Sequence, residues 1–281
     1  MTPQAAAGAG LLGAGAVGVG SAYLAGAFDG SGSSEVEMEP TNVLLSSEDN
    51  FSSVYPNAGL IGKEYGNYLV SPIGSKTKEK VTIDNKKWWE WSYKRWKKDF
   101  ENQQAKVNLS NEFKDGDKVS KAFSDSTTES DSSTALNRVC ESVYKKDKSL
   151  LAFEPGTTDN KIRLKNDLFK YCSIFGELKT IGEVSTETYE DNTKGKVDAN
   201  IKKFIATTGN DKFWAKRNEE FYAGAGDKSK SQATGASSKF KTKSAGNPKP
   251  EIKEICREAY ESNTSGDNGY PDDEVSRFCT L

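Results

Sequence analysis

The residues in this chain with the clearest potential for chemistry are its four cysteines, Cys140, Cys172, Cys256 and Cys279. Histidine is absent from all 281 positions, which removes Ser-His-Asp and Cys-His nucleophile pairs, the histidine zinc site of metalloproteases and the side chain best suited to proton transfer near neutral pH. The 41 acidic residues follow no recognisable catalytic spacing, although an exported hydrolase that uses carboxylates stays an open alternative. We therefore expect no catalytic, cofactor or metal site and a structural role for the cysteines.

Three kinds of segment occur twice along the chain, in a similar order. They are an aromatic heptad, a Cys-x-x-x-Tyr segment and a segment of the type cation, aromatic, Cys, hydroxyl, aliphatic. The first copies lie at residues 89–96, 140–144 and 170–174, and the second copies lie at residues 214–221, 256–260 and 277–281. Because three matches in one order are hard to obtain by chance, we infer a duplicated module of a Trp helix, a linker and two cysteine-bearing segments.

Each cysteine lies on the apolar stripe of an expected amphipathic helix. Apolar side chains recur at helical spacing in residues 136–144 and again in residues 252–260, behind Pro250. Two helices with facing apolar stripes form a hairpin, which brings the cysteines of each module together. In an oxidising compartment we therefore expect the disulfides Cys140–Cys172 and Cys256–Cys279. Four cysteines allow three connectivities, and free buried thiols are the alternative for a cytosolic chain. A four-thiolate zinc site would need Cys-x-x-Cys pairs, which are missing.

Residues 86–100 combine tryptophans with basic residues more densely than any other segment. On a helical wheel one aromatic stripe faces a core, while Trp91 projects among Lys87, Arg95 and Lys98. We regard these four as candidate partner-binding residues, since a ring beside cations could contact a lipid headgroup, a glycan or another protein. Binding of nucleic acid or another polyanion to residues 76–98 is one alternative, and a merely solvated helix face is the other.

The N-terminal residues 5–28 form an uncharged run of Ala, Gly and apolar side chains. An α-helix needs about 20 apolar residues to cross the hydrocarbon core, so we expect residues 1–28 to anchor the chain in a membrane. Small residues at every fourth position would let two such helices associate closely. They are Gly10, Ala14, Gly18, Ala22 and Gly26. A signal peptide cleaved after Ala27 and a merely flexible tract are the alternatives.

The composition of the remaining chain predicts modest cores separated by polar segments. Only 35% of the residues are hydrophobic and 28% are charged, with a net charge of -2. We expect a polar linker at residues 29–57, a helical module at 58–175 and a second helical module at 176–281 with a flexible insert at 223–249. The expected fold class is therefore mainly α, with an N-terminal transmembrane helix followed by two small disulfide-stapled helical modules joined by polar linkers.

The order of these features resembles that of the large paralogous families of surface proteins encoded by haemotropic mycoplasmas. The shared features are a small-residue N-terminal segment, a Lys/Ser/Glu-rich body, the Lys-Lys-Trp-Trp-Glu-Trp sequence of residues 86–91 and the Phe-Cys pair at 278–279. The resemblance implies a body displayed at the cell surface and a role in host contact or antigenic display. Together these features predict a membrane-anchored, extracellular protein that acts by binding a host or neighbouring surface protein rather than by catalysis.

Overall fold

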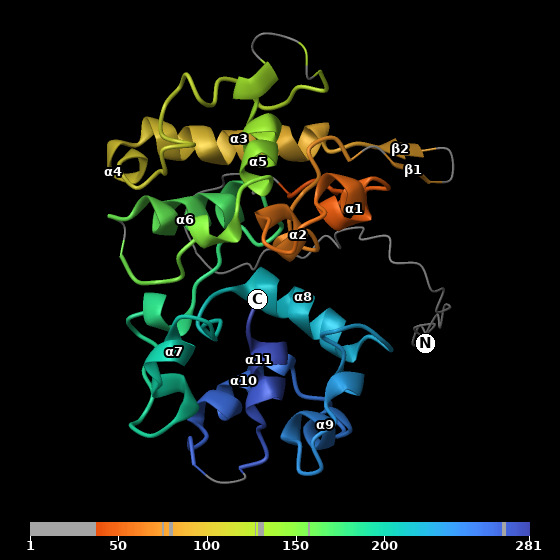
Figure 1. Ribbon diagram of the computed structural model, residues 1–281, viewed down its shortest axis with the longest axis vertical. Coiled ribbons are helices and arrows are strands. Elements are labelled where there is room, and N and C mark those ends of the chain that lie inside the picture. The colour runs from red at the N-terminus through yellow and green to blue at the C-terminus, as the bar shows by residue number, and fades with distance from the viewer. Residues whose placement is uncertain are drawn as a thin grey trace, which may run out of the picture.

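The described residues form a mainly helical structure, as expected. They contain eleven α-helices, several short 3-10 turns and one two-stranded hairpin. Figure 1 shows the chain in two halves, with α3, α5 and α6 in the upper half and α8, α10 and α11 in the lower half. The computed structural model describes residues 38–74, 76–78, 81–126, 128, 132–156, 158–265 and 268–281.

We use module 1 for the described residues up to 175 and module 2 for those from 176 onward. The helices of module 1 are α1 (Phe51–Val54), α2 (Ile61–Tyr65), α3 (Lys86–Glu101), α4 (Gln103–Lys106), α5 (Leu136–Tyr144) and α6 (Asn160–Tyr171). The hairpin β1 (Lys76–Lys78) and β2 (Val81–Ile83) is antiparallel and precedes α3. The helices of module 2 are α7 (Asp198–Ile201), α8 (Asp211–Tyr222), α9 (Lys239–Ser244), α10 (Ile252–Glu261) and α11 (Asp272–Cys279).

The longest helix, α3, buries the aromatic stripe that the sequence predicts. Trp89 and Trp96 are almost fully buried, and so is Trp88 beside them. Trp89 Nε1 donates to the carbonyl oxygen of Ser71 at 3.1 Å, and Trp96 Nε1 donates to that of Phe113 at 2.9 Å. Because each buried indole has its hydrogen-bond partner, the stripe can form a core without a desolvation penalty for the N–H group.

Two disulfides fasten the second cysteine segment of each module to the first. Cys140 in α5 is bonded to Cys172 at the end of α6, and Cys256 in α10 is bonded to Cys279 at the end of α11. All four residues are fully buried and none is free. The expected pairing is confirmed.

The same framework of buried hydrogen bonds occurs in both modules. In each module an asparagine directly before the Trp helix binds two backbone segments through its side-chain amide oxygen and nitrogen. A tyrosine of the first cysteine helix in each module donates its hydroxyl to two carbonyl oxygens. The asparagines are Asn85 and Asn210, and the tyrosines are Tyr144 and Tyr260. Buried polar groups need such partners, so their recurrence at equivalent positions indicates two copies of one supersecondary unit.

The segments expected to be polar linkers contain buried side chains, so the structure differs from the sequence interpretation there. Leu45 and Tyr55, in the described part of residues 29–57, are nearly inaccessible to solvent. The expected flexible insert at 223–249 contains α9, whose Phe240 is fully buried with its ring centroid 5.0 Å from that of Phe278. A single large apolar side chain anchors a polar segment, because its burial contributes roughly 1.5–3 kcal/mol.

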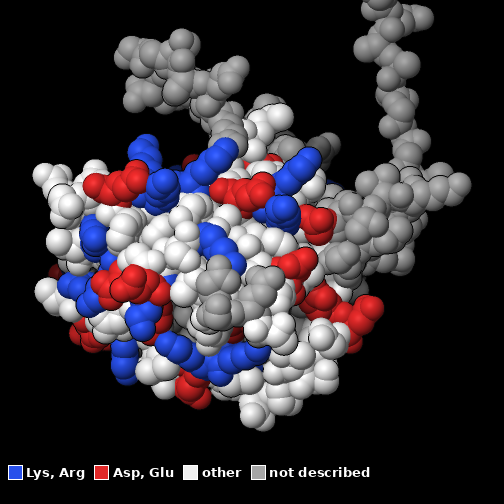
Figure 2. All heavy atoms as spheres, turned by 90° about the horizontal axis from the view of Figure 1, so that it is seen from above, with Lys and Arg blue, Asp and Glu red and all other residues white. Residues whose placement is uncertain are grey.

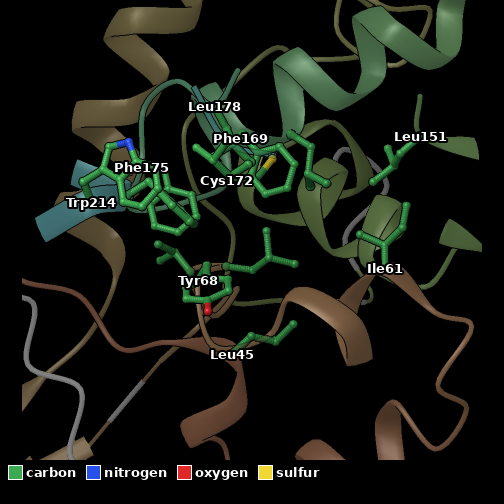
Figure 3. Packing of buried hydrophobic residues seen from close by; sticks show 14 of the residues in the cluster. Leu45, Ile61, Tyr68, Leu151, Phe169, Cys172, Phe175, Leu178 and Trp214 are labelled. Carbon is green, nitrogen blue, oxygen red and sulfur yellow. The ribbon is translucent and has the colours of Figure 1, made fainter. Parts of the chain in front are cut away.

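The two modules share one hydrophobic core. Phe175 of module 1 meets Phe213 of α8 edge to face, with 5.5 Å between the ring centroids. In Figure 3, Phe175 and Trp214 lie in the same packed cluster as Tyr68. Arg217 of α8 is buried and donates to the Tyr68 hydroxyl at 3.1 Å and to carbonyl oxygens of the last residues of the chain. The modules therefore contact each other through both apolar and polar groups.

The expected transmembrane helix at residues 1–28, with its ladder of small residues, lies outside the described residues. From residue 38 onward, in the ranges given above, no helix combines the length and the apolar character needed to span a bilayer. The anchor therefore stays a prediction from the sequence.

Candidate functional site

Two of the four predicted partner-binding residues, Trp91 and Arg95, lie together at the junction of the modules. The Arg95 guanidinium lies over the Trp91 ring at 4.5 Å from its centroid, and Lys212 of α8 places its ammonium group 5.5 Å from the same ring. Lys212 also pairs with Glu39, and Arg95 donates to the carbonyl oxygen of Gly176 at 3.4 Å. Burial lowers the pKa of Arg95, although nearby acidic groups oppose this shift. Trp91 thus joins the two modules and is partly buried against their core.

The other two predicted residues, Lys87 and Lys98, are exposed on α3. No ion pair within the described residues involves either of them. Sequence reasoning missed one residue of this cluster, Lys212. The spacing between the two Trp segments places Lys212 in module 2 at the position that Lys87 has in module 1. The repeat was therefore the signal that could have directed attention to α8.

The described part of the basic stretch 76–98 has acidic groups near it. Figure 2 shows Lys and Arg interspersed with Asp and Glu on the upper end of the molecule, where α3 lies. Lys97 pairs with Glu101 at 3.8 Å, and Asp99 accepts from Lys170 at 2.6 Å. A polyanion would meet groups of both signs here, so this surface gives no specific support to nucleic-acid binding.

A hollow of about 530 Å³ lies in module 1, between residues 111–118 and α5 with the residues on either side of this helix. Its lining contains two carboxylates, two ammonium groups, three hydroxyls, one amide and the side chain of Val139. The charged groups belong to Glu112, Asp117, Lys118 and Lys146. Nothing in the sequence indicates this hollow, because residues 101–134 have the composition of a linker and only the folded chain brings them against α5.

Glu112 is held in its ionised form at the wall of the hollow. Lys146 Nζ donates to one carboxylate oxygen at 2.7 Å, and Asn160 Nδ2 donates to the other at 3.4 Å. Burial alone would raise the pKa of Glu112, but these hydrogen bonds and the charge of Lys146 outweigh it and hold the pKa below its ordinary value. A glycosidase needs one carboxyl group that stays protonated at working pH, which Glu112 does not provide. Glu112 is therefore an ionised hydrogen-bond acceptor at the wall of the hollow.

One wall of the hollow is tied to α6 by a buried acidic residue. Ser110 N donates to Asp167 Oδ2 at 2.7 Å, and Ser110 directly precedes Asn111 of the lining. Burial raises the pKa of Asp167 to about 7, although the hydrogen bonds from Ser110 act in the opposite direction. Glu274 holds the same place in module 2, five positions before the second cysteine, and accepts a hydrogen bond from Ser238. In each module, an acidic residue on the last helix therefore accepts a hydrogen bond from a serine in the segment that packs against that helix.

No family model, curated protein or solved structure matches the chain. Within the ranges that the structure describes, no three acidic or cysteine side chains are grouped as metal ligands. The hollow and the Trp91 cluster must therefore be interpreted from their own geometry.

Proposed function

We propose that this chain is an extracellular surface protein that acts by binding a partner rather than by catalysis. The observation that carries the proposal is the pair of buried disulfides, Cys140–Cys172 and Cys256–Cys279. Structural disulfides form and persist mainly in oxidising environments such as the cell exterior, and they are rare in reducing cytosol. Their position across each module, where they fix two helices, supports a role in keeping an exported body folded.

The proposal includes attachment to the cell membrane through residues 5–28, with the bulk of the chain outside the cell. Self-association through the small-residue ladder of that segment is part of the same proposal. The resemblance to the surface proteins of haemotropic mycoplasmas supports a host protein or a neighbouring surface protein as the partner, in host contact or antigenic display. The alternatives of polyanion binding and carboxylate hydrolysis have no specific observation in their favour.

Two measurements on cells that produce the protein test the proposal. Protease added to intact cells should cleave the body, and mass mapping without reduction should recover the Cys140–Cys172 and Cys256–Cys279 peptides. A lysed sample and a cytosolic marker control for leakage. A body that is cleaved only after lysis, with all four thiols open to alkylation when the protein is denatured without a reductant, would contradict both the location and the function.

A further inference from the structure

The two modules differ at one equivalent place, between the first cysteine helix and the segment that packs against it. In module 2, Glu258 of α10 accepts hydrogen bonds from Lys243 of α9 at 2.9 Å and from the Tyr270 hydroxyl at 2.7 Å. Glu258 is the second residue after the bridged cysteine, and the residue at that position in module 1 is Ser142. Ser142 instead donates to the carbonyl oxygen of Val139 within its own helix at 2.7 Å. Module 1 joins these segments through Lys146 and Glu112 instead, and Ser142 lines the hollow.

The groups around the hollow include hydrogen-bond donors and acceptors whose formal charges cancel. The two carboxylates only accept, the two ammonium groups only donate, and the hydroxyls do both. Some of these groups already have a partner within the chain, since Ser142 donates to the carbonyl oxygen of Val139, Thr134 bonds with Ser120, and Lys146 donates to Glu112. A ligand that carries hydroxyl groups can use the remaining donors and acceptors of the lining, because each hydroxyl both donates and accepts. A ligand with a strong charge of either sign would instead meet two groups of its own sign. The lining therefore favours a ligand that is polar but has no net charge.

The size of the hollow and its one apolar residue narrow the class of ligand further. A volume of about 530 Å³ is within the range of small-molecule sites. Val139 offers a small apolar contact for the C–H face of a ring, and Glu112 is already fixed by Lys146. A preformed wall lowers the cost of ordering side chains on binding.

We infer that the hollow of module 1 binds a neutral carbohydrate, while Glu258 at the equivalent place in module 2 joins α10 to Lys243 and Tyr270 and has a structural role. This inference rests on the proposed function and names the chemical class that the surface protein recognises. Because the hollow is open to solvent, we expect a dissociation constant on the order of a millimolar for a single sugar. Since the ligand has no net charge, its affinity should change little with salt concentration.

The experiment titrates the purified full chain with methyl glycosides of glucose, galactose, mannose and N-acetylglucosamine and records saturation transfer by NMR. Ser142→Tyr places a ring in the hollow and should weaken binding at least tenfold. Ser53→Tyr is the matched control, because Ser53 is also an exposed helical serine whose hydroxyl donates to a carbonyl oxygen three residues earlier at 2.7 Å. Asp117→Ala, at an exposed residue of the lining, should weaken binding severalfold and covers the case in which Ser142→Tyr does not fold.

Transfer to at least one neutral glycoside that is lost with Ser142→Tyr and kept with Ser53→Tyr would support the inference. Transfer to none of the glycosides, or equal binding by both tyrosine variants, would overturn it. Binding of a short zwitterionic peptide alone, weakening steeply from about 50 to 500 mM salt, would overturn the ligand class. Exposure on intact cells is measured separately. A chain that is exposed at the surface but binds none of the sugars would contradict only this inference and leave the proposed function in place.

Discussion

The variant Asp167→Asn should change how the stability of the protein depends on pH. Asp167 is 4% exposed, and burial raises its pKa from 3.8 to about 7 in the folded chain. Between about pH 4 and pH 7 the unfolded chain therefore releases this proton while the folded chain keeps it, so the free energy of unfolding falls as the pH rises. At 1.36 kcal/mol per pH unit, the fall attributable to Asp167 is about 4 kcal/mol. The asparagine can still accept from Ser110 N but carries no charge, so it should remove this fall.

The assay is urea unfolding at intervals from pH 4 to pH 8, followed by tryptophan fluorescence with the disulfides intact. The difference between variant and parent isolates Asp167 and its interactions, because groups that do not interact with Asp167 contribute equally to both. We expect the variant to match the parent near pH 4 and to exceed its stability near pH 8. Asp115→Asn, at an exposed position in the same module, is the matched control. A constant difference between Asp167→Asn and its parent across the whole pH range would refute the buried, raised-pKa description of this residue.

Three further predictions concern the framework of the modules, and all are measured by urea unfolding. Replacing both Cys256 and Cys279 by alanine opens a loop with a sequence separation of 23 and should cost about 3 kcal/mol, so a loss below about 1 kcal/mol would contradict a structural bridge. Asn85→Ala and Asn210→Ala each leave buried backbone groups unpaired and should each cost about 3 kcal/mol; a large effect in only one module would argue against equivalent roles. Phe240→Ala should cost about 3–5 kcal/mol, whereas a flexible insert would tolerate it with almost no change.

The helices and disulfides are predictable from the sequence because their signals are local. Cys140 and Cys256 lie on apolar stripes with helical spacing, and one bridge across each hairpin follows from that geometry. Trp89 and Trp96 are likewise placed on a buried face by periodicity alone. For each helix about ten residues contain the whole pattern, whereas the pairing of the cysteines also relies on the expected packing of two helices.

The contacts that depend on tertiary packing are not predictable in this way. Phe240 is one ring in a Lys- and Ser-rich segment, and nothing within that segment indicates which surface buries it. Trp91 is correctly identified as lying beside Arg95, but the contact with Lys212 comes from the other module. The hollow depends on how residues 111–118 pack against α5, and Asp167, which holds one wall, resembles any other acidic residue on a charged helix face.

The hydrogen bond between Arg217 and Tyr68 limits how the two halves of this molecule can be exchanged or separated. A fragment that ended near residue 175 would present Phe175 and neighbouring rings to water, and the complementary fragment would leave a guanidinium without the phenol that meets it. A chimaera with another chain could replace one half only if the incoming half supplied a compatible residue at position 68 or 217. Substitutions on outer loops should therefore be tolerated one at a time, whereas those at this junction should be tolerated only as a matched pair.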